Sequence, residues 1–244
     1  MGNVVRHPRS RPSTGRARIV PLVLAAGVGA LLLSGCSGTG EPKSDGHTPD
    51  ASAPARLWPE RSPAPRPTYD EDERDTYDAP WPSHGMPRVP SGDIRKVPAL
   101  TIVKAQVAAG KYPRGTAQFL QADRQKINNC ATARKQCPVL TPQYRDVTGD
   151  GKDELLAGIE AGNDELVLWI FKVRNGTVSQ ILDIAVAPLS LEVAGRDVIT
   201  REPSELTGYD TRTVYSWDEH SQSMIARVSD YVAVDATTTR KSTS

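Results

Sequence analysis

The sequence predicts an α+β domain, in which one or two N-terminal helices pack on an antiparallel sheet of about five to seven strands. Two observations lead to this fold class. Apolar residues at helical spacing come first, between about residues 98 and 128. Segments rich in β-formers, separated by turn residues, follow from residue 144 onward. Helices followed by a run of strands are typical of the α+β class.

The first 35 residues have the pattern of a secretory signal peptide. Arginines precede a short apolar run, Ile19 to Leu33, which contains too much Gly and Ala for a membrane span of about 20 apolar residues. The run ends in Leu33-Ser34-Gly35-Cys36, which resembles the lipobox of bacterial lipoproteins. That resemblance implies cleavage before Cys36 and acylation of its sulfur with chains such as palmitate. The mature protein would then be anchored on the extracytoplasmic face of the cell membrane. An uncleaved anchor with a chance cysteine is the alternative.

A disordered, proline-rich linker is predicted for residues 36–92. Of the 20 prolines, 11 lie between Pro42 and Pro90, where aliphatic residues are scarce. Such a stretch buries too little apolar surface to offset its ordering entropy. If flexible, the 56 residues 37–92 would reach about 40 Å. One folded domain is then expected over 93–235, with a disordered tail over 236–244.

Two features of the linker stand out from its composition. The acidic run Asp70 to Asp78 is most simply a solvated segment, although it could contact a basic partner or a divalent ion. Trp58 and Trp81 are unusual in a disordered segment, and either could pack on the domain or on a partner.

Two cysteines remain once Cys36 is assigned to lipidation. Cys130 and Cys137 are seven positions apart, and an extracytoplasmic location permits disulfides. The four histidines are scattered without the spacing of zinc ligands. We therefore expect a Cys130–Cys137 disulfide around a small basic loop, with two free thiols as the alternative.

The predicted elements follow in order. "VPALTIVKAQVAAG" places Leu100, Val103 and Val107 on one helix face, with Pro98 at the start and Gly110 at the stop. A weaker helix is expected over 116–128, with Phe119, Leu120 and Ile127 facing inward. Asn175-Gly176 predicts a type I′ hairpin between two strands, and Gly195 and residues 218–222 predict two further turns.

"DVTGDGKDEL" is the candidate metal loop. Asp146, Thr148 and Asp150 occupy alternate positions before the bend at Gly151, a spacing that suits oxygen coordination of calcium. An EF-hand is excluded, because the position of its bidentate glutamate holds Ala157 and the flank "LLAGIE" is typical of a strand. A glycine-rich turn whose carboxylates accept hydrogen bonds from backbone amides explains the same residues without a metal.

The loop resembles the calcium loop of FG-GAP or VCBS-type repeats, which lies in a hairpin between blade strands. The resemblance implies a structural calcium ion and a single blade-like unit, because only one copy of the motif is present. The ligand set it implies is Asp146, Asp150 and Glu154 by side chain and Lys152 by its carbonyl, with Thr148 departing from the usual Asn or Asp.

The lipobox, the proline-rich linker and a domain with Tyr144, Asp146, residues 148–155, Tyr215 and Trp217 together resemble secreted lipoproteins of high-GC Gram-positive bacteria. Some such lipoproteins are encoded beside sensor kinases and restrain envelope-stress signalling. We therefore expect a non-enzymatic interaction or envelope-signalling domain that could be braced by calcium, with an envelope protein such as a sensor kinase as partner. The net charge of +1 gives no indication of nucleic-acid binding. An envelope hydrolase or a solute-binding lipoprotein is the alternative, and His220 is the one histidine that the predicted domain could offer to catalysis.

Overall fold

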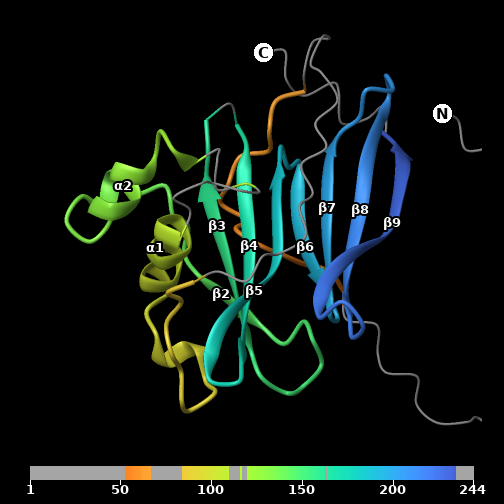
Figure 1. Ribbon diagram of the computed structural model, residues 1–244. Helices are drawn as coiled ribbons and strands as arrows, with labels where there is room; N and C mark the ends of the chain where they lie inside the picture. Colours follow the sequence, from red (N-terminus) through yellow and green to blue (C-terminus); the bar gives the residue numbers. More distant parts are fainter. Residues whose placement is uncertain (1–52, 67–83, 110–115, 117–119, 163, 235–244) are drawn as a thin grey trace, which may run out of the picture. The chain divides into compact units, whose positions relative to one another are not determined.

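The computed structural model describes residues 53–66, 84–109, 116, 120–162 and 164–234 (Figure 1). These residues all belong to the unit His47–Ser244. The predicted signal peptide, Cys36, the acidic run, Trp81 and the tail 236–244 lie outside the described residues.

Nine strands in the described part of the chain form two antiparallel sheets, whereas a single sheet of five to seven strands was expected. The four-stranded sheet is a simple meander of β2 (Gln143–Arg145), β3 (Glu154–Glu160), β4 (Leu166–Arg174) and β5 (Thr177–Val186). The five-stranded sheet has the order β1 (Ala55–Arg56), β6 (Ser190–Ala194), β7 (Asp197–Pro203), β8 (Tyr209–Asp218) and β9 (Ser223–Ala233).

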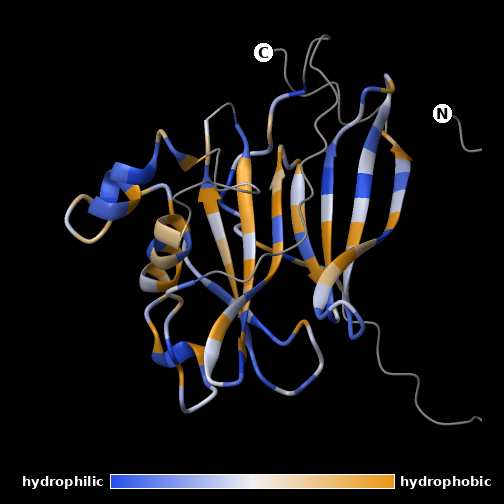
Figure 2. Cartoon of the chain, in the orientation of Figure 1, coloured by the Kyte–Doolittle hydropathy of each residue, from blue (hydrophilic) through white to orange (hydrophobic). Residues whose placement is uncertain are grey.

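The four-stranded sheet is the middle layer of this unit (Figure 1). Alternate residues of β4 enter two different apolar clusters: Val167 and Trp169 pack toward the helices, whereas Leu168 and Ile170 pack toward the five-stranded sheet. Burial on both faces explains why residues 166–171 of β4 are an uninterrupted apolar run, most of which is orange in Figure 2. The strands of the outer sheet instead alternate between apolar and polar residues.

Two short α-helices cover one face of the middle sheet. α1 (Ala99–Ala109) begins directly after Pro98 and buries Ile102, Val103 and Val107, so its apolar face lies slightly to one side of the predicted one. α2 (Arg124–Asn129) is shorter than the expected 116–128, because residues 121–123 form a turn before it. Single 3-10 turns occur at Ile94–Lys96 and Arg134–Gln136.

The predicted hairpins are confirmed. Asn175 and Gly176, with φ of 50° and 72°, join β4 to β5 with Arg174 opposite Thr177. Gly195 lies in the β6–β7 turn, and residues 219–222 connect β8 to β9.

Part of the predicted linker belongs to the folded unit. Residues 53–66, which we call the N-terminal strap, pair through β1 with β6, and Leu57 and Trp58 are buried in the cluster between the sheets. Met86 and Val89 are buried in the other cluster. The linker prediction for 36–92 was therefore wrong for these segments, because one tryptophan and a few backbone pairings compensate for a composition poor in aliphatic residues.

Trp58 is the anchor of the strap. Its side chain is 2% exposed, and its indole N–H donates to the carbonyl of Thr141 over 2.7 Å. The ring lies on Gly158 of β3, where a Cβ would come within 2.8 Å of the indole. The absence of a side chain at Gly158 therefore makes the seat for the indole.

Two arginines that follow Trp58 in the chain fasten the strap to the sheets. Arg61 forms an ion pair with Glu160 of β3 at 2.9 Å and donates to the carbonyl of Asp164. Arg66 forms an ion pair with the buried carboxylate of Asp210, which also accepts from Arg201 at 2.7 Å. The strap thus contacts both sheets.

We predict that Trp58→Ala lowers the free energy of unfolding by about 3–5 kcal/mol, the usual loss for a fully buried tryptophan. Denaturant unfolding of the purified protein measures the change. Glu60→Ala, at an exposed position of the same strap, is the control and should stay within about 0.5 kcal/mol of wild type. Equal stabilities of the two variants would mean that the strap does not contribute to the fold.

Candidate functional site

The candidate metal loop connects β2 to β3, as the sequence predicts. We call residues 146–154 the acidic loop. Gly149 and Gly151 have φ of 80° and 78°, the left-handed backbone that glycine adopts without strain. Both oxygens of Asp146 accept hydrogen bonds from these glycines, at 2.6 Å from the Gly149 N–H and 2.9 Å from the Gly151 N–H. Asp146 therefore shapes the turn.

Glu154 closes the base of the acidic loop. Its side chain is 1% exposed, and it accepts hydrogen bonds from the backbone N–H groups of Val147 and Thr148 at 2.9 and 3.1 Å. The Thr148 hydroxyl donates to its other oxygen over 3.2 Å. Burial raises the pKa of Glu154, although these hydrogen bonds and the nearby Lys172 ammonium oppose the rise.

Asp150 contacts a lysine from another strand. The ammonium of Lys172, in β4, donates to Asp150 Oδ2 at 2.8 Å and to the Thr148 hydroxyl at 2.6 Å. Partial burial of Asp150 disfavours its charge, but hydrogen bonds from Lys172 and from the Lys152 N–H outweigh this and hold its pKa below the ordinary value.

The predicted ligand set is therefore only partly brought together. Thr148, Asp150 and Glu154 converge, whereas both Asp146 oxygens accept from backbone amides and Lys152 donates its N–H to Asp150. In the described ranges, no three His, Cys, Asp or Glu side chains are arranged to hold a metal ion.

Residues from other strands complete the surroundings of the acidic loop, and the sequence analysis did not find them. They are Lys172 of β4, Trp217 of β8 and Arg196 of the β6–β7 turn, whose guanidinium packs on Gly149 so closely that a Cβ there would lie 1.9 Å from Nη1. The one sequence feature that could have pointed to these neighbours is the lone lysine, Lys172, in the apolar run "LVLWIFKV".

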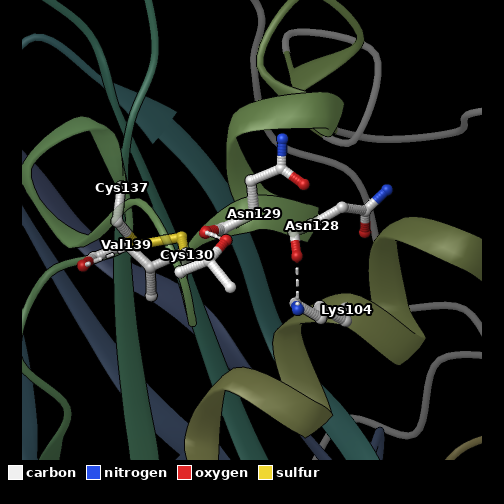
Figure 3. The surroundings of a disulfide bond; sticks show 7 residues. Lys104, Asn128, Asn129, Cys130, Cys137 and Val139 are labelled. Carbon is white, nitrogen blue, oxygen red and sulfur yellow. Dashed lines mark hydrogen bonds between the residues drawn. A yellow bond between two sulfur atoms is a disulfide. The ribbon is translucent and has the colours of Figure 1, made fainter.

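The predicted disulfide is present. Cys130, at the end of α2, is bonded to Cys137, and their Cα atoms are 4.7 Å apart (Figure 3). The Lys104 ammonium of α1 donates to the Asn128 carbonyl at 2.6 Å, near the same end of α2. The bridge and this hydrogen bond together hold the short α2, which six residues of helix alone would not stabilise.

The hydrolase alternative depends on His220 or on a pair of carboxyl groups. His220 is exposed in the β8–β9 turn. An open depression of about 400 Å³ beside the disulfide is lined mainly by apolar residues, among them Pro98, Leu100 and Val139, and His220 is not among its lining residues. The apolar lining of this depression would suit an apolar solute better than acid–base catalysis.

Glu202, in β7, is a carboxyl group in an unfavourable environment. Burial raises its pKa, the hydrogen bond from the Ala187 N–H opposes the rise, and the negative charge of Glu165 adds to it. Perturbed carboxyl pairs occur in active sites, but buried structural groups are perturbed in the same way.

Comparison of the chain with protein families, with curated proteins and with solved structures gives no match. Among the residues that the structure describes, no helix has the length and apolar character needed to span a membrane. The function must therefore be inferred from the chain's own sequence and geometry.

The raised pKa of Glu202 predicts a pH-dependent contribution to stability. The folded state holds this proton more tightly than the unfolded state, so the contribution is full below the unfolded pKa and is lost as the pH rises through the folded pKa. Glu202→Gln should therefore be more stable than wild type at neutral pH and similar to it at about pH 4.

Melting temperatures of both proteins across this pH range measure the effect. A difference between them that does not vary with pH would contradict a raised pKa for Glu202.

Proposed function

We propose that this chain is a membrane-anchored extracytoplasmic lipoprotein whose folded unit is a non-enzymatic interaction domain. The lipobox residues Leu33 to Cys36 support the anchor. The exposed edge strand β9 is the main observation that supports an interaction domain. In this proposal the helices, the disulfide and the blade-like four-stranded sheet form a scaffold, and the partner binds to the five-stranded sheet.

β9 lies at one edge of its sheet and has few of the features that normally protect an edge. After an extra residue at Arg227, the strand continues from Val228 to Ala233 without proline or lysine. Natural edge strands commonly carry such residues to prevent pairing with another chain. The two charged groups nearby are engaged within the domain, Arg227 with Asp218 at 2.7 Å and Asp230 with Arg212 at 3.7 Å.

The face of β8 and β9 beside this edge has the composition of a binding surface. Tyr231 is 62% exposed and Tyr209 is 43% exposed, and both lie on one face because Tyr231 pairs with Thr211. Thr213 and Ser229 form the next pair on that face. Tyrosine is enriched in protein interfaces because it offers apolar area and a hydroxyl with little conformational freedom to lose.

The partner that fits these features is an extended segment of an envelope protein. A strand added to β9 would pair with its outer backbone groups, to which no other strand of the described residues is paired. Its side chains would alternate between the tyrosine face and the opposite face, where Val228 is 45% exposed. The extracytoplasmic part of a sensor kinase is one partner of this kind.

The opposite edge of the same sheet is already occupied. β1 pairs with β6, and further along the strap the Leu57 and Ala64 N–H groups donate to the carbonyls of Leu191 and Pro188. Only residues 37–52 separate Cys36 from the start of the strap. A flexible chain of that length would reach about 20 Å, so the anchor would limit the distance of the domain from the membrane more strictly than a linker ending at residue 92.

The lipid anchor makes a direct prediction. Cys36→Ser should move the protein from the membrane fraction to the soluble extracytoplasmic fraction and abolish incorporation of labelled palmitate, because a stable attachment needs the acyl chains. Ser37→Ala is the matched control and should leave both unchanged. Membrane retention of the Cys36→Ser protein without label would mean that residues 19–33 remain as the anchor.

The proposed binding edge is tested with lipidated protein in intact cells. Tyr231→Lys places a charge on the free edge and should abolish crosslinking to the envelope partner, with little change in melting temperature because the side chain is exposed. Glu60→Lys, on the strap, should leave crosslinking intact. Equal capture of one protein by both variants would show that the partner binds elsewhere.

A further inference from the structure

The acidic loop is neutralised by a cation that belongs to the chain itself. We propose that the ammonium group of Lys172 is the resident cation of residues 146–154 and takes the place of the calcium ion that the FG-GAP or VCBS resemblance implies. The acidic loop then closes without a divalent ion. This inference does not depend on the proposed interaction with a partner.

The ammonium lies where the loop oxygens converge. Its nitrogen is 2.6 Å from the Thr148 hydroxyl, 2.8 Å from Asp150 Oδ2 and 3.6 Å from Glu154 Oε1. These oxygens come from loop positions that the calcium motif would use as ligands. One point positive charge surrounded by three oxygens is the arrangement that a small metal ion would otherwise produce.

The position of Lys172 is fixed by its strand. It lies in β4 opposite Ser179, on the face that carries Ile170 toward the five-stranded sheet, and its side chain is 13% exposed. The nitrogen also lies 5.2 Å from the centre of the Trp217 ring in β8, within range of a cation–π interaction. The lysine therefore connects the acidic loop to the outer sheet.

The remaining loop oxygens are poorly disposed for calcium, which takes six to eight oxygen ligands at about 2.3–2.6 Å. Both Asp146 oxygens accept from backbone amides, Asp150 Oδ1 accepts from the Lys152 N–H, and Glu154 Oε2 accepts from two backbone amides. The Arg196 guanidinium packed on Gly149 adds a second positive charge beside the loop. A divalent ion would have to displace Lys172 and work against Arg196.

The experiment compares the full chain with Lys172→Met, which keeps much of the side-chain volume and removes the charge. Melting temperatures are measured in chelator, in millimolar calcium chloride and in sodium chloride of matched ionic strength. Lys152→Met, an exposed lysine of the same loop, is the control. Lys172→Arg tests whether a cation at position 172 is sufficient.

We expect the melting temperature of the wild type to be the same in all three solutions, and we expect the same of Lys152→Met. Lys172→Met should melt on the order of 10 °C lower in chelator, because two carboxylates lose their counter-charge. Calcium, and not sodium chloride, should restore part of that loss. Lys172→Arg should remain insensitive to calcium.

Two results would overturn the proposal. The first is a calcium-dependent rise in the melting temperature of the wild type that Asp150→Asn abolishes, since the metal would then bind with Lys172 in place. The second is a Lys172→Met protein that is as stable as wild type, or less stable but indifferent to calcium, since the ammonium would then not stand at a cation position. If Lys172→Met fails to fold, calcium titration of the wild type still decides between an internal and an external cation.

Discussion

The four-stranded sheet must be covered on both faces, and the rest of the structure follows from this requirement. Leu168 and Ile170 face one way along β4, while Trp169 and Phe171 face the other, and all four are fully buried. Each such side chain contributes about 1.5–3 kcal/mol when it leaves water, so neither face can remain exposed. The helices cover one face, and a second sheet covers the other. The strap closes the space between the sheets through Trp58.

Two carboxylates at the margins of this core are paired with basic side chains. Glu154 lies near Lys172 of β4, and Asp210 is paired with Arg66 of the strap and with Arg201 of β7. A buried carboxylate without a partner would be strongly destabilising, so these pairs fix which segments lie together. They add little net stability of their own, but they specify the position of the acidic loop and of the strap.

Features formed by residues close together in the sequence were predictable, whereas contacts between residues far apart in the chain were not. The Asn175-Gly176 hairpin depends on two backbone conformations that these residues favour, and the Cys130–Cys137 bridge depends on elimination among three cysteines. Both features are encoded within ten residues. The loop between β2 and β3 was recognised for the same reason.

The features that were missed join residues far apart in the chain. The sequence of β4 gave no sign that two layers cover the strand. A continuous apolar run is equally compatible with any fully buried helix or strand. Lys172 and Asp150 are separated by 22 positions, and Trp58 and Thr141 by 83. Residues 36–92 are poor in aliphatic residues, and the sequence showed only that Trp58 could pack on the domain. Its seat on Gly158 and the pairing of β1 with β6, which together hold the strap, could not be read from the sequence.

An internal cation is well matched to the location that we propose for this domain, on the outer side of a membrane. There the supply of divalent ions varies with the surroundings, and a loop braced by a weakly bound ion would open and close with that supply. A lysine carried on β4 has a fixed effective concentration, because its backbone is part of the sheet. Its contact with Trp217 extends this constraint into β8, the neighbour of the free edge strand β9. If β9 binds a partner as proposed, the internal cation would keep the neighbouring acidic loop in one conformation whatever the ionic conditions.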